Sequence, residues 1–408
     1  MKTLICIPCL MTGGTEIQTL NTVRALVQGG HEVTVACYFE HTPYMIGQFE
    51  EAGAKVLLFS PDGNRQGGWR IVPFLYKNLR SVIKAVRPDM VHVQYMAPGA
   101  MVILLLWLMR VKNIIATVHT AADIYKDLRL IHFIQRHCVR AWICITERAE
   151  HSFFGSSQLY SKNMVLGKRN HFTIYNALPF RQPVNCDDSQ VNVAEQRLKE
   201  TQSQGDDSPA TPLRFTSNSV AIHLSEAAPV LGLVSRLEHI KGMALIVPAF
   251  AEVRKRFPDV QLLVVGDGSL RAAMEQQAMA LGCDDAVTWA GRQPQEELSQ
   301  YYSRMDIVLM PSRSEGFGLT AIEAMAHGCV VVASDIGGLP EVVRDGVCGL
   351  LHRSEDVKDM AEKICSLIAS SELYRSLQKN ALQHVQKFSF QRYAELIHNL
   401  YSKALKRG

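Results

Sequence analysis

The strongest constraint on the fold is an alternation of short β-branched segments with amphipathic helical segments, which occurs twice along the 408-residue chain. In the first half, seven short apolar runs have the composition of strands, from L-I-C-I at 4–7 to F-T-I-Y at 172–175. The pattern resumes with five more runs, from P-V-L-G-L-V-S at 229–235 to C-V-V-V-A at 329–333. Strands that alternate with helices form parallel sheets covered on both faces. We therefore expect an α/β protein with two Rossmann-like, doubly wound domains.

The two alternating regions are separated by a segment of different composition. Residues 182–228 are rich in Gln, Ser, Asp, Asn and Thr and show little periodicity, which is typical of a linker or insertion that is partly disordered. The chain also exceeds the size at which one hydrophobic core usually stops growing. We therefore expect one domain at 1–181, a second at 229–387 and a C-terminal helix at 388–408 that packs back on the first domain. A ligand of two such domains binds in the central cleft, at the carboxyl ends of the strands.

Composition argues against several other classes of protein. A hydrophobic content of 47% and a charged content of 20% are those of a globular protein rather than of a disordered or integral membrane protein. The stretch 91–109 has no Lys, Arg, Asp or Glu, but Pro98 and Gly99 divide it into a strand and a helix too short to cross a bilayer. The C-x-x-C of Cys6 and Cys9 has no second pair to complete a zinc site. We expect reduced thiols in a cytoplasmic protein, with redox or metal chemistry as the alternative.

Positive charge is concentrated in the first domain. Residues 1–180 hold 19 Lys and Arg against 11 Asp and Glu, a net charge of +8, whereas the whole chain carries +4. The stretch 126–140 places Arg129, Arg136 and Arg140 among Leu, Ile and Phe residues. Such a stretch fits contact with an anionic partner, such as a membrane surface or a pyrophosphate-linked acceptor. Ordinary scatter of charge is the alternative.

The segment S-E-G-F-G-L-T-A-I-E-A-M-A-H-G at 314–328 has the strongest functional pattern. It places Glu315 in a turn whose two glycines leave room for a ligand to approach the backbone, and Glu323 one to two turns into the helix that follows. We expect that helix to begin near Phe317–Leu319, so that its free N–H groups and dipole can receive an anion. Two carboxylates at this spacing suit different hydroxyls of one long ligand. The same spacing also occurs where one glutamate caps a helix and the other is solvated.

Three shorter patterns follow predicted strands. G-L-V-S-R-L-E-H-I-K-G at 232–242 presents Arg236 and Lys241, two cations that fit a diphosphate but that could equally occupy a solvated turn. C-L-M-T-G-G-T-E at 9–16 has two glycines before a helix, a turn whose N–H groups can point at a ligand. T-V-H-T places His119 at the carboxyl end of a strand, although a single histidine there is more often a packed or surface residue.

Together these motifs resemble those of the retaining glycosyltransferases of family 4, which have the GT-B fold of two Rossmann-like domains facing a central cleft. The 314–328 segment is similar to the E-x7-E signature of that family. G-G-T-E at 13–16 resembles its N-terminal glycine loop, and S-R-L-E-H-I-K-G at 235–242 resembles its diphosphate site. I-Y-N-A-L-P at 174–179 and G-G-L-P-E-V-V at 337–343 are similar to the segments that enter the linker and follow the signature helix.

The resemblance implies a role for each motif. Glu323 would accept hydrogen bonds from ribose hydroxyls, while Glu315 and His119 would contact the sugar being transferred. Arg236 and Lys241 would neutralise the departing diphosphate by electrostatic stabilisation, with no metal ion and no cofactor. The implied catalytic residues are Glu315, His119, Arg236 and Lys241. The implied donor-binding set extends over both domains and also includes Gly13, Gly14, Arg292 in A-G-R-Q-P, Gly316, Phe317, Gly318, Leu319, Thr320 and Glu323.

The implied function is transfer of a sugar from a nucleotide-sugar to a glycan or lipid-linked acceptor bound by the first domain. UDP is favoured as the nucleotide and GDP is next, and no nucleic-acid partner is expected. Cell-envelope polysaccharide synthesis in the cytoplasm, at the inner face of the membrane, would be the setting. A GT-B epimerase or phosphorylase and a non-catalytic nucleotide-binding module are the alternatives. A dehydrogenase is the least favoured, because G-D-G-S at 266–269 and the first glycine turn lack the dinucleotide fingerprint.

Overall fold

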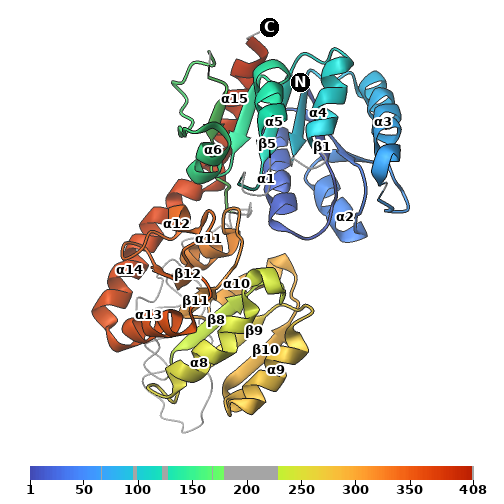
Figure 1. Cartoon of the computed structure of the whole chain (residues 1–408). Helices are drawn as coiled ribbons and strands as arrows, with labels where there is room; N and C mark the ends of the chain where they lie inside the picture. The colour runs from blue at the N-terminus through green and yellow to red at the C-terminus, as the bar shows by residue number, and fades with distance from the viewer. Residues whose placement is uncertain (66, 95–98, 122–126, 168, 179–227, 407–408) are drawn as a thin grey trace, which may run out of the picture.

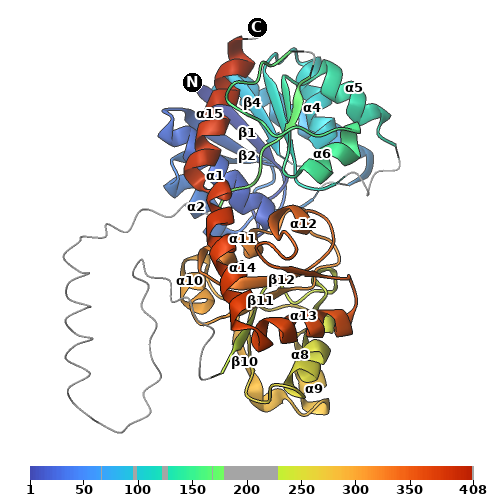
Figure 2. The same ribbon diagram turned by 90° about the vertical axis from the view of Figure 1, so that its left-hand side faces the viewer.

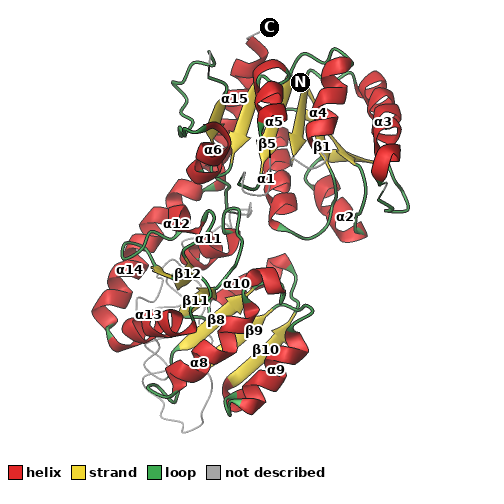
Figure 3. Cartoon of the chain, viewed as in Figure 1, coloured by secondary structure: helices red, strands yellow, loops and turns green. Residues whose placement is uncertain are grey.

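The chain folds into two α/β domains, each built around one parallel sheet, in the computed structural model of the protein (Figure 1). Helices lie on both sides of each sheet (Figure 3). The predicted linker at 182–228 lies outside the described residues, apart from Ala228. The structure describes residues 1–65, 67–94, 99–121, 127–167, 169–178 and 228–406.

The first domain contains a seven-stranded sheet in which neighbouring strands are all parallel. The strand order β3-β2-β1-β4-β5-β6-β7 reverses between β1 and β4, so their carboxyl ends mark the switch point where ligands of such sheets bind. The apolar runs predicted in the first half all form strands of this sheet, and most of their side chains are buried. The strands are β1 Lys2–Ile7, β2 Glu32–Cys37, β3 Ala54–Leu58, β4 Met90–Gln94, β5 Ile114–Val118, β6 Ala141–Cys144 and β7 His171–Thr173.

The second domain has a six-stranded parallel sheet with the order β10-β9-β8-β11-β12-β13. Its switch point lies between β8 and β11. The five predicted runs form β8 to β12, whereas β13 was not predicted because it has only three residues and no clear pattern. The strands are β8 Val230–Val234, β9 Gln261–Val265, β10 Val287–Gly291, β11 Ile307–Met310, β12 Val330–Ser334 and β13 Leu350–His352.

The helices bury their apolar faces against these sheets. Helix α4 is the apolar segment that mimics a membrane span, and its Val102 and Leu106 are fully buried in the first domain. Within the described parts of the chain, no helix combines the length and apolar character needed to cross a membrane. The helices of the first domain are α1 Gly14–Gln28, α2 Pro43–Glu51, α3 Ile71–Val86, α4 Gly99–Leu108, α5 Arg129–His137 and α6 Glu147–Phe154. Those that follow β8 are α8 Ile246–Arg254, α9 Arg271–Ala280, α10 Leu298–Tyr302, α11 Leu319–Ala326, α12 Leu339–Val342, α13 Val357–Ala369, α14 Ser371–His384 and α15 Phe390–Lys406.

The last helix links the two domains. Helix α14 packs in the second domain, whereas α15 packs against α1 of the first (Figure 2). The hydroxyls of Tyr393 and Thr22 share a hydrogen bond of 2.7 Å, and Nε2 of His398 lies 2.6 Å from the carbonyl oxygen of Ala25. The end of the chain is therefore part of the first domain's packing, although it follows the second domain in sequence.

A second link between the domains is made by Glu341 of α12. Its carboxylate oxygens accept hydrogen bonds from the backbone N–H groups of Glu147 (2.8 Å) and Arg148 (2.6 Å) at the start of α6. The first N–H groups of a helix have no acceptor within that helix. A carboxylate of the second domain therefore satisfies and stabilises the beginning of a helix in the first.

Candidate functional site

The 314–328 segment leads from β11 into α11, which begins at Leu319 as the sequence predicts. Within it, the backbone at Gly316 comes very close to the first domain. A Cβ atom added to Gly316 would lie 2.3 Å from the carbonyl oxygen of His119, a distance that real Cβ atoms essentially never show. Glycine is therefore required for the two domains to meet here. The glycine was predicted to leave room for a ligand, whereas in the structure the side-chain position of residue 316 is taken by the backbone of His119.

Glu315 forms an ion pair with Lys241. The Nζ atom lies 2.7 Å from Oε2, and the two side chains are 16% and 23% exposed. Lys241 ends the short turn His239–Lys241, and Gly242 follows it with a φ of 70°. A Cβ atom on Gly242 would lie 1.8 Å from the carbonyl oxygen of Pro311, so this turn can pack against the end of β11 only because residue 242 is a glycine. That packing brings the predicted diphosphate cation into contact with the predicted sugar carboxylate.

Glu323 lies on α11 and is 7% exposed. Its Oε2 accepts a hydrogen bond of 2.9 Å from the hydroxyl of Tyr302, and its Oε1 accepts one of 3.0 Å from Nε2 of Gln295. Burial raises the pKa of Tyr302 well above its ordinary value, and the negative charge of Glu323 raises it further, so the phenol stays protonated and donates. Each carboxylate oxygen can accept more than one hydrogen bond. Glu323 is therefore held in place while it can still receive hydroxyl groups.

The first domain contributes the turn between β1 and α1. A Cβ atom on Gly14 would lie 3.5 Å from Cδ1 of Leu319, so this turn faces the start of α11. In the first turn of α1, Oε1 of Glu16 accepts a hydrogen bond of 3.1 Å from Sγ of Cys9. Burial raises the pKa of Glu16, while the hydrogen bond from Cys9 and the positive charge of Arg236 act in the opposite direction. The exposed Arg236 of the second domain thus acts electrostatically on this turn.

His119 follows β5 and is 6% exposed. Its Nε2 lies 2.9 Å from Oε1 of Gln94, at the end of β4. An amide oxygen can only accept a hydrogen bond, so Nε2 carries the proton and Nδ1 is an acceptor. Burial lowers the pKa of His119 to about 4, so the imidazole is neutral at pH 7. A neutral ring can exchange hydrogen bonds with a hydroxyl group, but it cannot supply positive charge to a departing anion.

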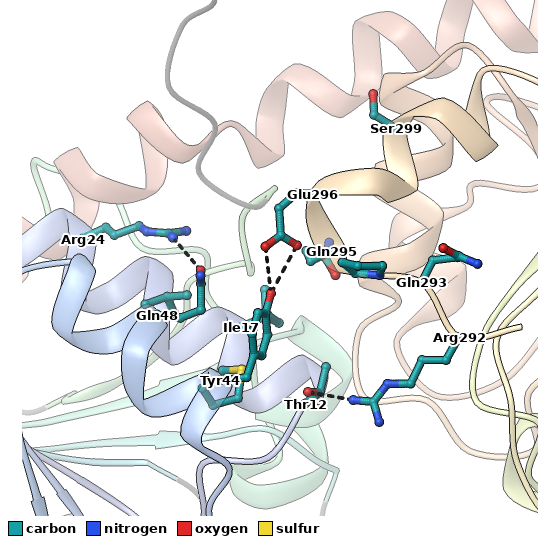
Figure 4. A pocket seen from close by; sticks show the side chains of 13 residues that line it. Thr12, Ile17, Arg24, Tyr44, Gln48, Arg292, Gln293, Gln295, Glu296 and Ser299 are labelled. Atoms are coloured by element: carbon teal, nitrogen blue, oxygen red, sulfur yellow. Dashed lines mark hydrogen bonds between the residues drawn. The ribbon is translucent and has the colours of Figure 1, made fainter.

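A cavity of about 640 Å³ opens between α1 and α2 of the first domain and the segment after β10 in the second (Figure 4). Two hydrogen bonds cross it: Nη2 of Arg292 donates to Oγ1 of Thr12 (3.2 Å), and the hydroxyl of Tyr44 lies 3.2 Å from both carboxylate oxygens of Glu296. Gln295 lines the same cavity and also binds the glutamate of α11. The cavity therefore adjoins the helix that carries the sequence signature.

The side chain of Phe317 is buried in an aromatic cluster and does not line the site. Its ring packs against those of Tyr175 and Phe388, with centroid distances of 6.1 Å and 5.6 Å. Only the backbone of Phe317 is therefore available to a ligand. Gly318, which follows, has a φ of 103° and directly precedes α11.

The structure arranges the other predicted site residues in two neighbouring groups. One group surrounds the contact between the domains, and the other lies along α11 and beside the cavity. The first group comprises Gly14, His119, Lys241, Glu315, Gly316 and Leu319, with Gly13 and Arg236 close to Glu16 at its edge. The second comprises Glu323, Arg292 and Thr320, whose side chain interacts with Tyr302.

Several partners of these residues were missed by sequence reasoning. They are Thr12, Gln94, Gln295 and Tyr302. The polar run after A-G-R at 290–292 was a weak signal for Gln295, whereas only the fold brings Tyr302 to Glu323. Over the residues that the structure describes, no three or more His, Cys, Asp or Glu side chains form a group that could hold a metal ion. That the site needs neither metal nor cofactor stays a prediction.

Two family models match the chain, one on each domain. The model described as Glycosyltransferase Family 4 matches residues 12–154, and the one described as Glycosyl transferases group 1 matches residues 216–384. D-inositol 3-phosphate glycosyltransferases of Segniliparus rotundus and Nocardia farcinica are 38% and 37% identical to this chain over 189 residues. These alignments cover 45% of this chain and 42% of each relative, so the chain spans less than half the length of the curated relatives it matches.

Solved structures resemble the chain over almost its whole length. The Anabaena protein HepE, in complex with UDP and glucose, covers 98% of this chain and 99% of its own, with 20% identity and a TM-score of 0.70. A glycosyltransferase of Rickettsia africae covers 100% and 99%, with 17% identity and a TM-score of 0.73. Sucrose-phosphate synthase of Thermosynechococcus elongatus covers 100% of both chains, with 20% identity and a TM-score of 0.69. The likeness confirms the predicted GT-B arrangement of two Rossmann-like domains.

The close approach at Gly316 predicts that Gly316→Ala destabilises the protein. The added methyl group cannot fit beside the carbonyl oxygen of His119, and overpacking of this kind costs about 1–3 kcal/mol. Thermal and denaturant unfolding of the whole chain would measure the loss. Gly67→Ala is the matched control, because a Cβ atom at Gly67 meets nothing within 4 Å and the residue lies in extended backbone (φ −118°) outside any helix. Equal stability of the two variants would show that the domains do not meet at Gly316 in solution.

Proposed function

We propose that this chain, a GT-B protein like those of glycosyltransferase family 4, transfers a sugar from a nucleotide-sugar to an acceptor. The proposal is carried by the ion pair of Lys241 with Glu315 next to the contact of Gly316 with His119. There, a cation, a carboxylate and a neutral imidazole meet at the N-terminus of a helix, between two domains. This combination suits a ligand that carries hydroxyl groups and a diphosphate side by side.

The arrangement suggests how a nucleotide-sugar would lie. The sugar would contact Glu315 and His119, and the diphosphate would lie between the N-terminus of α11 and the cations Lys241 and Arg236. The ribose would bind Glu323, and the base would enter the cavity beside Arg292. Gln295 connects the two positions, because it lines the cavity and donates a hydrogen bond to Glu323. UDP is favoured as the nucleotide, in keeping with HepE, which was solved with UDP and glucose.

The residues also suggest the source of catalysis. As the bond to the sugar breaks, negative charge grows on the departing diphosphate, and fixed cations and helix N–H groups stabilise that charge without rearranging. His119 is neutral at pH 7, so Lys241 and Arg236 would supply the positive charge. We propose a hexosyl transfer that retains configuration and needs no metal ion, as the sequence signature implies.

The acceptor is proposed to be anionic and to bind the first domain. The curated relatives are named for an inositol phosphate, a phosphorylated polyol. A phosphorylated glycan or a lipid-linked diphosphate would suit the net charge of +8 on residues 1–180. Synthesis of a cell-envelope polysaccharide in the cytoplasm, at the inner face of the membrane, is the role that follows from such an acceptor.

A screen of UDP-, GDP- and ADP-sugars tests the function. A donor present at about 100 times its Kd should stabilise the protein by roughly 2.7 kcal/mol, and the same donor should then support transfer to a phosphorylated acceptor. Transfer should continue in EDTA. Release of a sugar phosphate in the presence of inorganic phosphate would indicate a phosphorylase, and epimerised donor would indicate an epimerase. Nucleotide binding with no turnover would indicate a non-catalytic module.

Calorimetry with free UDP and free GDP distinguishes the two glutamates. Glu323→Gln should weaken both nucleotides, because charge-assisted hydrogen bonds to the ribose are worth about 1.5–3 kcal/mol each. Glu315→Gln should leave the affinity for free nucleotide unchanged or slightly higher, because a neutral glutamine holds Lys241 less strongly than the ion pair does. The same substitution should depress transfer. Tyr302→Phe, which removes the buried donor to Oε2 of Glu323 without changing the lining of the cavity, controls for loss of an internal partner. If Glu315→Gln weakens free nucleotide as much as Glu323→Gln does, this division of roles is wrong.

A basic face of the first domain supports the proposed contact with an anionic membrane. A hollow of about 560 Å³ at the ends of α4 and α5 is lined by Trp107, Arg110, Lys112, Arg136 and Arg140, among others. Trp107, which lines the hollow, contacts Phe133 (ring centroids 6.0 Å apart), and both are exposed, as are Leu108 and Leu130 on the same two helices. Aromatic and aliphatic groups ringed by cations are typical of proteins that lie at a membrane interface. Arg129 was also predicted for this face, but its Nε lies 3.1 Å from a carboxylate oxygen of Asp127. This ion pair reduces the positive charge that Arg129 adds to the face.

Liposome binding tests this face. The chain should bind vesicles that contain phosphatidylglycerol, weakly at high salt, and should not bind pure phosphatidylcholine, because exposed charges are screened within about 8 Å at physiological ionic strength. Arg136→Glu with Arg140→Glu should weaken binding by more than about 2 kcal/mol. Lys358→Glu with Lys379→Glu, at exposed positions of the second domain, is the matched control.

Two results would contradict the membrane assignment. Salt-independent binding to neutral vesicles would mean that the charge of this face is incidental. Loss of binding on Trp69→Ala with no loss on Trp107→Ala would move the contact to the start of α3, where Trp69 is also exposed.

A further inference from the structure

A chain of buried hydrogen bonds runs from His119 to the last helix of the protein. Nε2 of His119 lies 2.9 Å from Oε1 of Gln94, and Nε2 of Gln94 lies 3.2 Å from Nε2 of His92. Nδ1 of His92 in turn lies 2.7 Å from the hydroxyl of Tyr401 on α15. Nε2 of His92 also lies 2.7 Å from Oγ1 of Thr117. All five side chains are at most 7% exposed, so solvent does not replace their partners.

The structure orients the Gln94 amide with Oε1 toward His119 and Nε2 toward His92, and with that orientation the hydrogen bonds fix the arrangement of protons. The amide nitrogen of Gln94 donates to Nε2 of His92, so that nitrogen must be an acceptor. The proton of His92 is then on Nδ1, from which it is donated to Tyr401. Burial lowers the pKa of His92 to about 3, with a further contribution from His119, so the ring carries a single proton. The amide oxygen of Gln94 consequently accepts from His119, and the proton of His119 is on Nε2.

We propose that Gln94, His92 and Tyr401 are positioning residues that fix which ring nitrogen of His119 carries the proton. They hold the proton on Nε2 and leave Nδ1 as an acceptor for a hydroxyl group. The consequence for turnover rests on the proposed function, in which His119 contacts the transferred sugar. The protonation of His119 itself does not depend on that function.

Loss of the Tyr401 hydroxyl should change each member of the chain in turn. Without it, Nδ1–H of His92 has lost its acceptor, and the proton is better placed on Nε2, where Oγ1 of Thr117 can accept it. Nε2 of His92 then no longer accepts from Gln94, whose amide group rotates and presents its NH2 to His119. The proton of His119 therefore moves to Nδ1. A substitution on α15 would thus reach the site between the domains.

Nitrogen-15 NMR of the whole chain, labelled at histidine, tests this directly. The spectrum distinguishes a protonated from an unprotonated ring nitrogen, and His119→Gln identifies the signal among the 14 histidines. We expect Nε2–H at His119 in the natural protein and a shift toward Nδ1–H in Tyr401→Phe. Gln94→Met, which removes both amide bonds and keeps the volume, should give a mixture of the two forms and serves if Tyr401→Phe folds poorly.

Tyr393→Phe is the matched control. Tyr393 lies on the same helix and its hydroxyl also makes a buried bond of 2.7 Å to the first domain, but to Thr22 of α1. Both Tyr→Phe variants should lose similar stability, and only Tyr401→Phe should change the His119 signal. With an active donor, kcat of Tyr401→Phe should fall roughly 10-fold, by analogy with groups that orient metal-binding histidines, with little change in donor KM.

The outcomes separate the two proposals. The positioning role would be overturned if His119 carried its proton on Nδ1, or were charged, in the natural protein. It would also be overturned if Tyr401→Phe and Gln94→Met left the His119 signal unchanged. Equal loss of kcat in Tyr393→Phe and Tyr401→Phe would overturn its effect on turnover. Absence of transfer with every nucleotide-sugar would instead overturn the proposed function, while the NMR result would still decide how the proton of His119 is held.

Discussion

The approach of the Gly316 backbone to the carbonyl oxygen of His119 sets the distance between the two domains at the candidate site. Because two backbones meet there, no side-chain movement can relieve the contact. The same strand end, β11, receives the turn of Lys241 through Gly242, so the cation is positioned by backbone packing as well. The ion pair with Glu315 then lies beside the contact. The close packing at Gly316 and Gly242 consequently fixes the geometry of the site, and it positions Glu315 and Lys241 next to each other.

Several charged and polar groups of the site already have protein partners. Lys241 is paired with Glu315, Glu323 binds Tyr302 and Gln295, and the guanidinium of Arg292 donates to a threonine of the first domain. A buried charge without a partner is costly, so such pairs keep the site folded and oriented. An ammonium group has three donors and a carboxylate accepts several hydrogen bonds. A ligand can therefore bind to these groups without breaking all of their existing hydrogen bonds. Groups that are already oriented favour specific binding and lose little free energy when the ligand binds.

The candidate site and the basic face lie at opposite ends of the strands of the first domain. The carboxyl ends of its strands lead to Gly14 and His119, whereas the basic and apolar face lies where α4 and α5 end, beside the beginnings of the strands. Contact with a membrane through that face would leave the site accessible from the other edge. Helix α15 lies along this domain and reaches the polar groups behind His119 through Tyr401. The end of the chain is thereby connected to the site from the rear of the sheet.

The strand–helix alternation, the two sheets and the position at which α11 begins could be predicted from the sequence, because they depend on local periodicity and on glycine. The sequence also indicated Glu315, Glu323, Lys241 and His119 as a set, through the order of the motifs. The contact of Gly316 with His119 and the hydrogen bond from Tyr302 to Glu323 could not be predicted in this way and were found in the folded structure. The folded structure alone also showed β13 and the link from His119 to α15. Those features depend on which distant segments pack together, and a close contact between backbones leaves no mark in local composition or periodicity.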